Sequence, residues 1–255
     1  MRVLIITQDD PFYLADNLNY LFNKSSDDIN YVGCVLLSPS PFGKKNESFF
    51  MKAYNTYKIF GLIFFITYSF RFLLNKFKKN KKVRNILNKH NIPCISLNKS
   101  INSNQSLSRL SEFKPDLIVS IAGNEIFKTP LINLAPSGCL NLHTALLPKY
   151  RGLMPSFWVL KNNEKVTGVS VFFVDEGIDS GEIISQEVID ICNLSQEELI
   201  NITKKIGMDL IYESIIKIIN NDFILIENPD ELSSYYGFPK REDVLEFKRL
   251  GKRFF

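Results

Sequence analysis

The sequence predicts an α/β protein built on a doubly wound, mostly parallel sheet, with a short C-terminal appendage. Three observations favour this class. Short apolar runs that resemble buried strands alternate along the chain with segments of helical length. Of the 255 residues, 45% are hydrophobic, which is enough for one good core. Polar residues also gather directly after apolar runs, as they do where strands end in α/β folds.

The N-terminal half contains alternating strand and helix patterns. Strands are expected at Val3–Thr7, Tyr31–Ser38, Pro93–Leu97 and Asp116–Ile121, and helices at Tyr13–Lys24, Val83–His90 and Gln105–Phe113. Asp9, Asp10 and Pro11 mark a turn after the first strand, and Ser38-Pro39-Ser40-Pro41 closes the second. No glycine-rich phosphate motif follows the first strand, so dinucleotide-binding and P-loop proteins lose their main support.

The C-terminal half continues the alternation. Strands are expected at Cys139–Leu142, Val166–Val174, Glu182–Ile191 (an edge strand) and Phe223–Ile226, and helices start near Pro155, at Ser195 and at Arg241. Proline suits a first helical position, and Ser195 with Glu198 forms a capping-box pattern for a helix that runs to about Ile219. The last helix ends before Gly251, a usual C-terminal cap. We expect residues 1–220 to form one Rossmann-like domain, with 221–255 as an extension packed on it rather than an independent domain.

The segment from residue 59 to residue 84 is unusual, because an uncharged apolar run (59–70) leads into a dense basic run. The apolar run is too short to span a bilayer. It can form a core or dimer helix with a solvated basic end, or an interfacial helix held by anionic lipid. The first interpretation is preferred because apolar runs of this length are usually buried, so peripheral membrane contact is not favoured.

Charge and cysteine usage exclude several classes of protein. The formal charge of +4 is mild and does not by itself imply nucleic acid. The four cysteines, Cys34, Cys94, Cys139 and Cys192, show no paired spacing, so we expect neither a disulfide framework nor a metal site. The N-terminus shows no signal-peptide pattern, and a cytoplasmic protein with reduced cysteines is expected.

A reaction centre is indicated where two strands end. Asn141 and His143 lie at the end of one strand, and Asp179 lies 36 residues after His143 in a glycine-rich acidic loop. A carboxamide can donate to a developing oxyanion, an imidazole can donate to it or move a proton, and a carboxylate can orient that imidazole or accept a proton. Asp179 could instead only cap a turn, and a lone histidine is more often structural than catalytic.

The ordered set of motifs resembles the folate-dependent formyltransferase domain. It comprises Asn141-Leu142-His143, residues 146–152 (LLPKYRG), Thr167-Gly168-Val169 and residues 177–181 (GIDSG). The resemblance implies that Asn141, His143 and Asp179 are catalytic and that 10-formyltetrahydrofolate is the co-substrate, without a metal. It also implies that the pterin is held, largely through backbone groups, by the turns that contain Ile121, Ala122, Gly123 and Asn124, and Asp175, Glu176, Gly177 and Ile178. Weaker candidates for substrate contact are Thr144, Tyr150 and Arg151.

The acceptor is expected to be a small amine, and a nucleotide-linked amino sugar is the leading candidate. The methionyl-tRNA enzymes of this family carry a further barrel domain, and only about 35 residues follow Asn220, so tRNA is an unlikely partner. Alternatives are a methionyl-tRNA formyltransferase-like enzyme, a hydrolase of the formyl donor, or a folate-binding module with a relic site. A homodimer is possible. Arg151 can also simply cover the apolar loop, Trp158 is expected to pack its helix, and His90 is expected at the surface.

Overall fold

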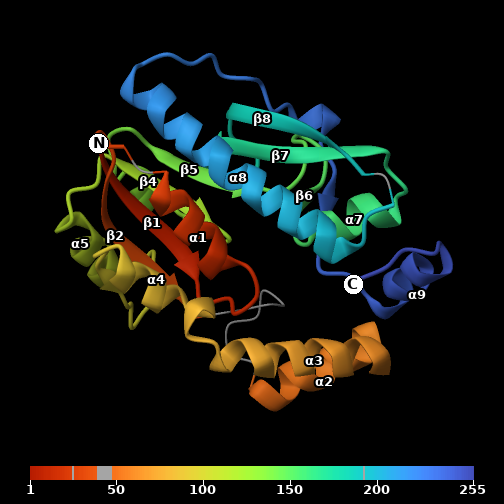
Figure 1. Cartoon of the computed structure of the whole chain (residues 1–255). Coiled ribbons are helices and arrows are strands. Elements are labelled where there is room, and N and C mark those ends of the chain that lie inside the picture. The colour runs from red at the N-terminus through yellow and green to blue at the C-terminus, as the bar shows by residue number, and fades with distance from the viewer. Residues whose placement is uncertain (25, 39–47, 192) are drawn as a thin grey trace.

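A central sheet organises the computed structural model, which describes residues 1–24, 26–38, 48–191 and 193–255. In this part of the chain the sheet has seven strands in the order β3-β2-β1-β4-β5-β7-β8 (Figure 1). Their bounds are β1 Arg2–Gln8, β2 Asn30–Leu37, β3 Cys94–Ile95, β4 Leu117–Ile121, β5 Cys139–His143, β7 Val166–Phe173 and β8 Ile183–Asp190. The proline turn expected at 39–41 and the expected reduced Cys192 lie outside the described residues.

Helices cover both faces of the sheet, which confirms the doubly wound α/β class. One face packs against α1 (Leu14–Asn23), α4 (Val83–Lys89) and α8 (Gln196–Ile219). The other packs against α5 (Asn104–Ser111) and α6 (Thr129–Ile132). The predicted capping box at the start of α8 is present, with the Ser195 side chain accepting from the Glu198 N–H and Glu198 accepting from the Ser195 N–H. The strands predicted at the positions of the seven sheet strands and the helices predicted between them are all found, with shifted ends.

Strand direction changes within the sheet. Strands β3, β2, β1, β4 and β5 are parallel, whereas β7 is antiparallel to β5 and β8 is antiparallel to β7. His143 lies opposite Ser170, and Leu140 lies opposite Phe173. The sheet is therefore mostly parallel, as predicted, but the loop after β7 leaves the sheet beside the start of β5 and not beside its end.

The apolar run at 59–70 begins at the end of one helix and continues in a second, and both helices lie beside the sheet domain. α2 (Phe49–Phe60) and α3 (Leu62–Phe77) meet at Gly61, whose φ of +87° breaks the helix. The pair lies at one end of the molecule, away from the sheet (Figure 1). Phe60 is buried, but no residue of α3 is. Of the two parts of that expectation, a core helix is wrong, because only one side of α3 meets the rest of the chain, whereas a dimer helix stays a prediction. No helix in the described residues is long and apolar enough to cross a membrane.

The C-terminal tail packs against α7 (Pro155–Lys161). Its helix α9 (Arg241–Arg249) supplies Phe247, which stacks on Phe157 with ring centroids 4.9 Å apart. A two-residue strand, β9 (Tyr235–Tyr236), pairs with β6 (Arg151–Gly152). The indole N–H of Trp158 donates to Gly237 O at 3.0 Å, so Trp158 packs its helix as expected. The strand expected at Phe223–Ile226 is wrong: only a single bridge joins Ile226 to Ile183.

Substitution at Gly207 tests how closely α8 approaches the sheet. A Cβ atom at Gly207 would lie 2.7 Å from Cδ2 of Leu142 in β5. We expect Gly207→Leu to lower stability by roughly 2–3 kcal/mol through overpacking, and the thermal midpoint by several degrees. Thermal denaturation followed by circular dichroism measures this. Gly237→Leu is the matched control, because nothing lies within 4 Å of that position; equal midpoints for the two variants would contradict the packing.

Candidate active site

Asn141 and His143 project from one face of β5, between β4 and β7. They are two residues apart on a strand, so their side chains share a face. Asn141 lies between Ser120 of β4 and Phe172 of β7 in the strand registers. Its side chain is half-buried, and no hydrogen bond is made to its carboxamide from the described part of the chain. A half-buried amide with unused donors and acceptors is suited to a ligand, since such groups are normally bonded.

His143 is buried and has a different partner at each ring nitrogen. Its Nε2 lies 2.7 Å from the Tyr150 carbonyl oxygen. A carbonyl can only accept, so Nε2 carries a proton and donates it. Its Nδ1 lies 3.5 Å from Oδ2 of Asp179. This separation exceeds a hydrogen bond, and such contacts in ligand-free sites often tighten on binding. Nδ1 is thus the nitrogen that can exchange a proton next to Asp179.

Asp179 reaches His143 from the far end of β5. Val174, which follows β7, donates its N–H to the carbonyl of Cys139, the first residue of β5. His143 is four residues further along, about 13 Å away at strand spacing. Both groups follow strands, as expected, but the two strand ends lie at opposite edges of the sheet, because β7 runs antiparallel to β5. The loop after β7 folds back along the sheet to place Asp179 beside His143.

Two contacts hold Asp179 in this position. The backbone N–H of Gly152 donates to Oδ2 of Asp179 at 2.8 Å. Gly152 has a φ of +98°, and a Cβ there would lie 2.3 Å from the carbonyl oxygen of Tyr236, so only glycine fits. The side-chain amide of Asn228 donates to the carbonyls of Asp179 and Gly181, both at 2.9 Å. The carboxylate is therefore aimed by its own loop, by the turn after β5 and by the tail.

Hydrogen bonds within the protein hold the two turns that are predicted to bind the pterin. Ile121 ends β4 beside Leu142, and its carbonyl accepts from the Thr7 hydroxyl at 2.9 Å. Ala122 and Gly123 continue from this end of the sheet, and the Asn124 amide donates to Ser38 O at 2.6 Å.

In the second turn, Oδ1 of Asp175 accepts from the Gly177 N–H at 3.0 Å, and Gly177 and Ile178 are exposed. The hydroxyl of Thr129, the first residue of α6, bonds to Glu176. The second turn is thus joined to the helix that follows the first.

Tyr150 and Arg151 are used inside the protein. The Tyr150 hydroxyl donates to Glu164 at 2.6 Å. Burial, and to a lesser extent this hydrogen bond, raises the pKa of Tyr150. The Arg151 guanidinium is buried and donates to Asp230 at 2.6 Å and to Asn228 O and Oδ1 at 2.9 and 3.0 Å. Both side chains therefore shape the turn. The third weak candidate for substrate contact, Thr144, directly follows His143 and is half-buried.

Sequence reasoning missed the residues that position this turn. The Ser170 hydroxyl donates to Ala145 O at 2.7 Å and accepts from the Leu147 N–H at 3.1 Å. Gln186 also donates to Ser170, at 2.8 Å. Asn228 was missed for a different reason: it lies 49 residues after Asp179, and no local pattern marks it.

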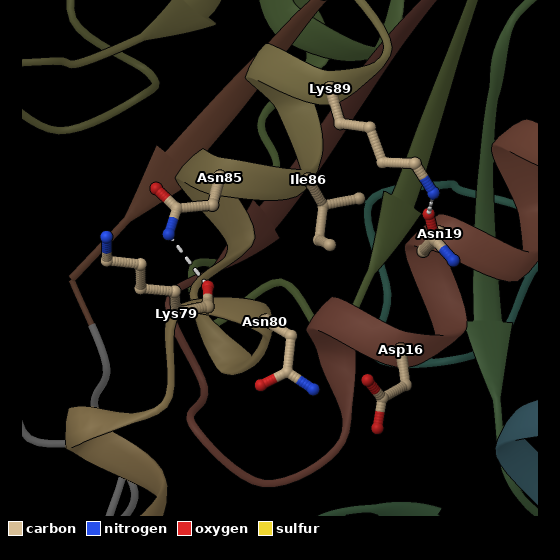
Figure 2. Close-up of a pocket in the computed structure, with 7 residues that line it drawn as sticks. All are labelled: Asp16, Asn19, Lys79, Asn80, Asn85, Ile86 and Lys89. Atoms are coloured by element: carbon tan, nitrogen blue, oxygen red, sulfur yellow. Dashed lines mark hydrogen bonds between the residues drawn. The ribbon is translucent and has the colours of Figure 1, made fainter.

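Three further observations concern parts of the structure outside this group of residues. A pocket between α1 and α4 is lined by Asp16, Asn19, Lys79, Asn80, Asn85, Ile86 and Lys89, none of them a predicted site residue (Figure 2). Within residues 1–24, 26–38, 48–191 and 193–255, no three His, Cys, Asp or Glu side chains are arranged to hold a metal ion. His90 is half-buried and not fully at the surface, because it contacts Asn19 and the ring of Phe22.

The family model described as Formyl transferase matches residues 65–215, a stretch that includes Asn141, His143 and Asp179. This is more than half of the chain, and the chain belongs to the formyl transferase family. A curated relative, methionyl-tRNA formyltransferase from Kosmotoga olearia, is 39% identical over 138 residues, which are 49% of this chain and 44% of that protein. The chain spans about half the length of the curated relatives it matches.

Solved structures share the fold. An N-formyltransferase from Helicobacter canadensis, in complex with folinic acid and dTDP-3-aminofucose, matches with a TM-score of 0.58 and 21% identity, over 95% of this chain and 72% of that one. Glycinamide ribonucleotide transformylase 1 from Symbiobacterium toebii matches with a TM-score of 0.62 and 15% identity, over 89% of this chain and 92% of that one.

Substitution of Arg151 tests its structural role. Lysine cannot reproduce the three hydrogen bonds of the guanidinium, so Arg151→Lys should lower the free energy of unfolding by roughly 2 kcal/mol or more. Urea unfolding provides the measurement. The control is Arg253→Lys, at a side chain that is 63% exposed, where a change within about 0.5 kcal/mol is expected. An Arg151→Lys variant with the same free energy of unfolding as the wild type would show that the guanidinium is not needed to join the turn to the tail.

Proposed function

We propose that this protein transfers the formyl group of 10-formyltetrahydrofolate to the amine of a small molecule. The observation that carries the proposal is the Asn141 carboxamide, to which the described residues make no hydrogen bond, beside the buried His143, whose Nδ1 faces Asp179. These groups supply an oxyanion donor and a proton-exchanging pair on one face of the sheet. Membership of the formyl transferase family supports the same chemistry.

The reaction that suits these groups is a direct displacement at the formyl carbon. The acceptor nitrogen attacks, a C–N bond forms, and the carbonyl oxygen becomes an oxyanion that accepts a hydrogen bond from Asn141. The acceptor nitrogen gives up a proton to the His143–Asp179 pair, directly or through one water. When the bond to N10 of the folate breaks, that nitrogen takes a proton back. No covalent enzyme intermediate is required.

The proton-exchanging atom follows from the hydrogen bonds of His143. Its Nε2–H is occupied by the Tyr150 carbonyl, which fixes the ring orientation. Nδ1 is left to face Asp179, whose Oδ2 is held by the Gly152 N–H. We therefore assign oxyanion stabilisation to Asn141, and proton exchange to Nδ1 of His143 together with Asp179. Within this proposal, residues 1–220 form the formyltransferase domain and 221–255 its docked extension.

The folate is placed against the turns of residues 121–124 and 175–178. The first turn lies at the end of β4, next to the end of β5 that carries His143. The second precedes Asp179 in the same loop. Gly123, Gly177 and Ile178 are exposed residues, so backbone groups of these turns that are not bonded within the turn can meet the hydrogen-bonding edge of a flat pterin. The folinic acid in the complex of the Helicobacter canadensis protein supports a folate co-substrate.

A nucleotide-linked amino sugar is the acceptor that we propose. The Helicobacter canadensis structure holds dTDP-3-aminofucose and matches 95% of this chain, including most of the tail that packs beside Asp179. A second candidate is methionyl-tRNA, because two curated relatives, which match at 39% and 32% identity, are named methionyl-tRNA formyltransferase. Both acceptors offer a primary amine to the same site.

A panel of acceptors tests the proposed function. Purified protein with 10-formyltetrahydrofolate is expected to release tetrahydrofolate when a nucleotide-linked amino sugar is present. Glycinamide ribonucleotide should give much slower release. Absorbance of the folate and mass spectrometry of the acceptor measure the two products. Rapid turnover with methionyl-tRNA alone would replace the proposed acceptor, and no release with any amine would contradict the function.

Substitutions at the three central residues test their roles. Asn141→Ala, His143→Ala and Asp179→Ala should each lower kcat roughly 100-fold or more, because each removes an oxyanion donor or a proton-handling group. Folate affinity, measured by fluorescence titration, should change far less. Lys149→Ala, at an exposed position in the loop that follows β5, serves as the control. Near-normal kcat in His143→Ala would remove this residue from the mechanism.

Chelation tests the expectation that no metal takes part. The proposed residues need no Lewis acid, and no zinc-type spacing occurs in the sequence. Prolonged treatment with EDTA followed by gel filtration should leave kcat unchanged. A rate that falls after chelation and returns with a divalent cation would show that a metal is required.

A further inference from the structure

An apolar stripe lies exposed along α3. Ile63, Ile66, Phe70, Leu73 and Phe77 recur every three or four residues, so they share one side of the helix. Their exposed fractions range from 53% to 82%. The neighbouring helix α2 adds exposed Phe50 and Tyr54. A run of large apolar side chains on an isolated chain normally marks a surface that contacts another body.

The opposite side of α3 is already occupied by the protein itself. Phe64 stacks between Phe60 and Tyr68, with ring centroids 4.5 and 5.6 Å away, and its edge meets Phe254 of the tail at 4.9 Å. Arg71 pairs with Glu197 at the start of α8. These contacts fix the orientation of the helix, so the apolar stripe faces away from the domain.

The charge around the stripe has one sign. From Phe49 to Arg84 the sequence contains nine lysine or arginine residues and no aspartate or glutamate. A basic cluster begins at the C-terminal end of the stripe and consists of Lys76, Lys78, Lys79, Lys82 and Arg84. All five side chains are exposed, and in the described part of the chain none of them is in a salt bridge.

We propose that the α2–α3 pair docks this protein on an anionic lipid surface. Amphipathic helices that lie in the plane of a membrane combine a stripe of Phe, Leu and Ile with flanking lysines, as α3 does. With 16 residues, α3 is about 24 Å long, shorter than the ~30 Å hydrocarbon core, so it lies on the bilayer and does not cross it. The apolar stripe enters the boundary between headgroups and acyl chains, and the basic cluster meets lipid phosphates.

Charge distinguishes this occupant from the two others that a basic apolar surface could meet. In a symmetric dimer the same patch meets its own copy, and that copy has no acidic residue between Phe49 and Arg84 to pair with the basic cluster. A nucleic acid duplex would use the lysines but leave the apolar stripe in water, since its backbone is recognised through phosphate contacts. Anionic lipid satisfies both features.

The turn that links α3 to the sheet domain makes direct contacts with α1 and α4. The short turn of Lys79–Lys81 follows α3, and the side-chain amide of Asn85 donates to Lys79 O at 2.7 Å (Figure 2). Lys81 pairs with Asp16 of α1, and Lys89 donates to Asn19 of α1 at 2.9 Å. The basic cluster is therefore tied to α1 and α4 and is not carried on a free linker.

Vesicle flotation tests the proposal with the whole protein. The vesicles contain phosphatidylcholine with roughly 30% phosphatidylglycerol, or phosphatidylcholine alone. Wild-type protein should float with the anionic vesicles at about 50 mM salt and dissociate at about 0.5 M, where the Debye length is ~4 Å. It should not float with neutral vesicles. Failure to bind anionic vesicles at low salt would overturn the proposal.

Two variants separate the contributions of charge and apolar surface. Replacing Lys76, Lys78, Lys79 and Lys82 by glutamine should weaken partitioning at least 100-fold, since each lysine contributes roughly fivefold. Replacing Lys99, Lys114, Lys128 and Lys165 by glutamine removes the same charge elsewhere and should change partitioning much less. The variant Ile63→Gln/Phe70→Gln should weaken it at least tenfold, with an unchanged thermal midpoint because both positions are exposed.

The remaining outcomes identify other occupants. If Ile63→Gln/Phe70→Gln binds vesicles as the wild type does, adhesion is purely electrostatic and the docking helix is excluded. If light scattering shows a dimer that this variant splits, and vesicles do not bind, the surface meets a second copy. If the protein binds RNA and not vesicles, the surface serves nucleic acid. As an independent measurement, Phe70→Trp should show a blue-shifted emission only with anionic vesicles.

Discussion

Three segments of the chain that are distant in sequence meet to place Asp179 beside His143. Because β7 is antiparallel to β5, the loop that carries Asp179 starts about 13 Å from His143 and must fold back. Two groups far away in sequence hold it there: the Gly152 N–H and the Asn228 amide. Arg151 in turn binds Asn228 and Asp230. The turn after β5, the loop after β7 and the tail therefore form one hydrogen-bonded unit.

The same tail joins this unit to the exposed helix pair. Tyr150 and Trp158 stack on Tyr236, with ring centroids 5.2 and 4.8 Å away. These rings belong to one apolar cluster that also contains Phe60 and the tail residue Phe254, with Phe64 packed against it. The cluster connects the turn that binds His143 to the base of α3. If α3 meets a lipid surface, this cluster links the lipid-bound helix to the turn that contacts His143.

The parts of the molecule that could be predicted from the sequence are those with a local signal. Buried apolar runs gave the strands, the Ser195–Glu198 capping box gave the start of α8, and the spaced motifs gave Asn141, His143 and Asp179 as candidates. Three features had no such signal. The direction of β7 depends on pairing with distant strands, and Asn228 acts across 49 residues. The exposure of α3 depends on what the rest of the chain leaves uncovered.

In the proposed reaction, the site of Asn141, His143 and Asp179 moves a formyl group from a folate nitrogen to an amine. A single turnover with an excess of enzyme, using 10-formyltetrahydrofolate labelled with ¹³C in the formyl carbon, follows this transfer. We expect the label to appear as an N-formyl group on the acceptor, and formate not to accumulate when the acceptor is present. Label found as formate whether or not an amine is present would rule out the proposed transfer and identify a hydrolase.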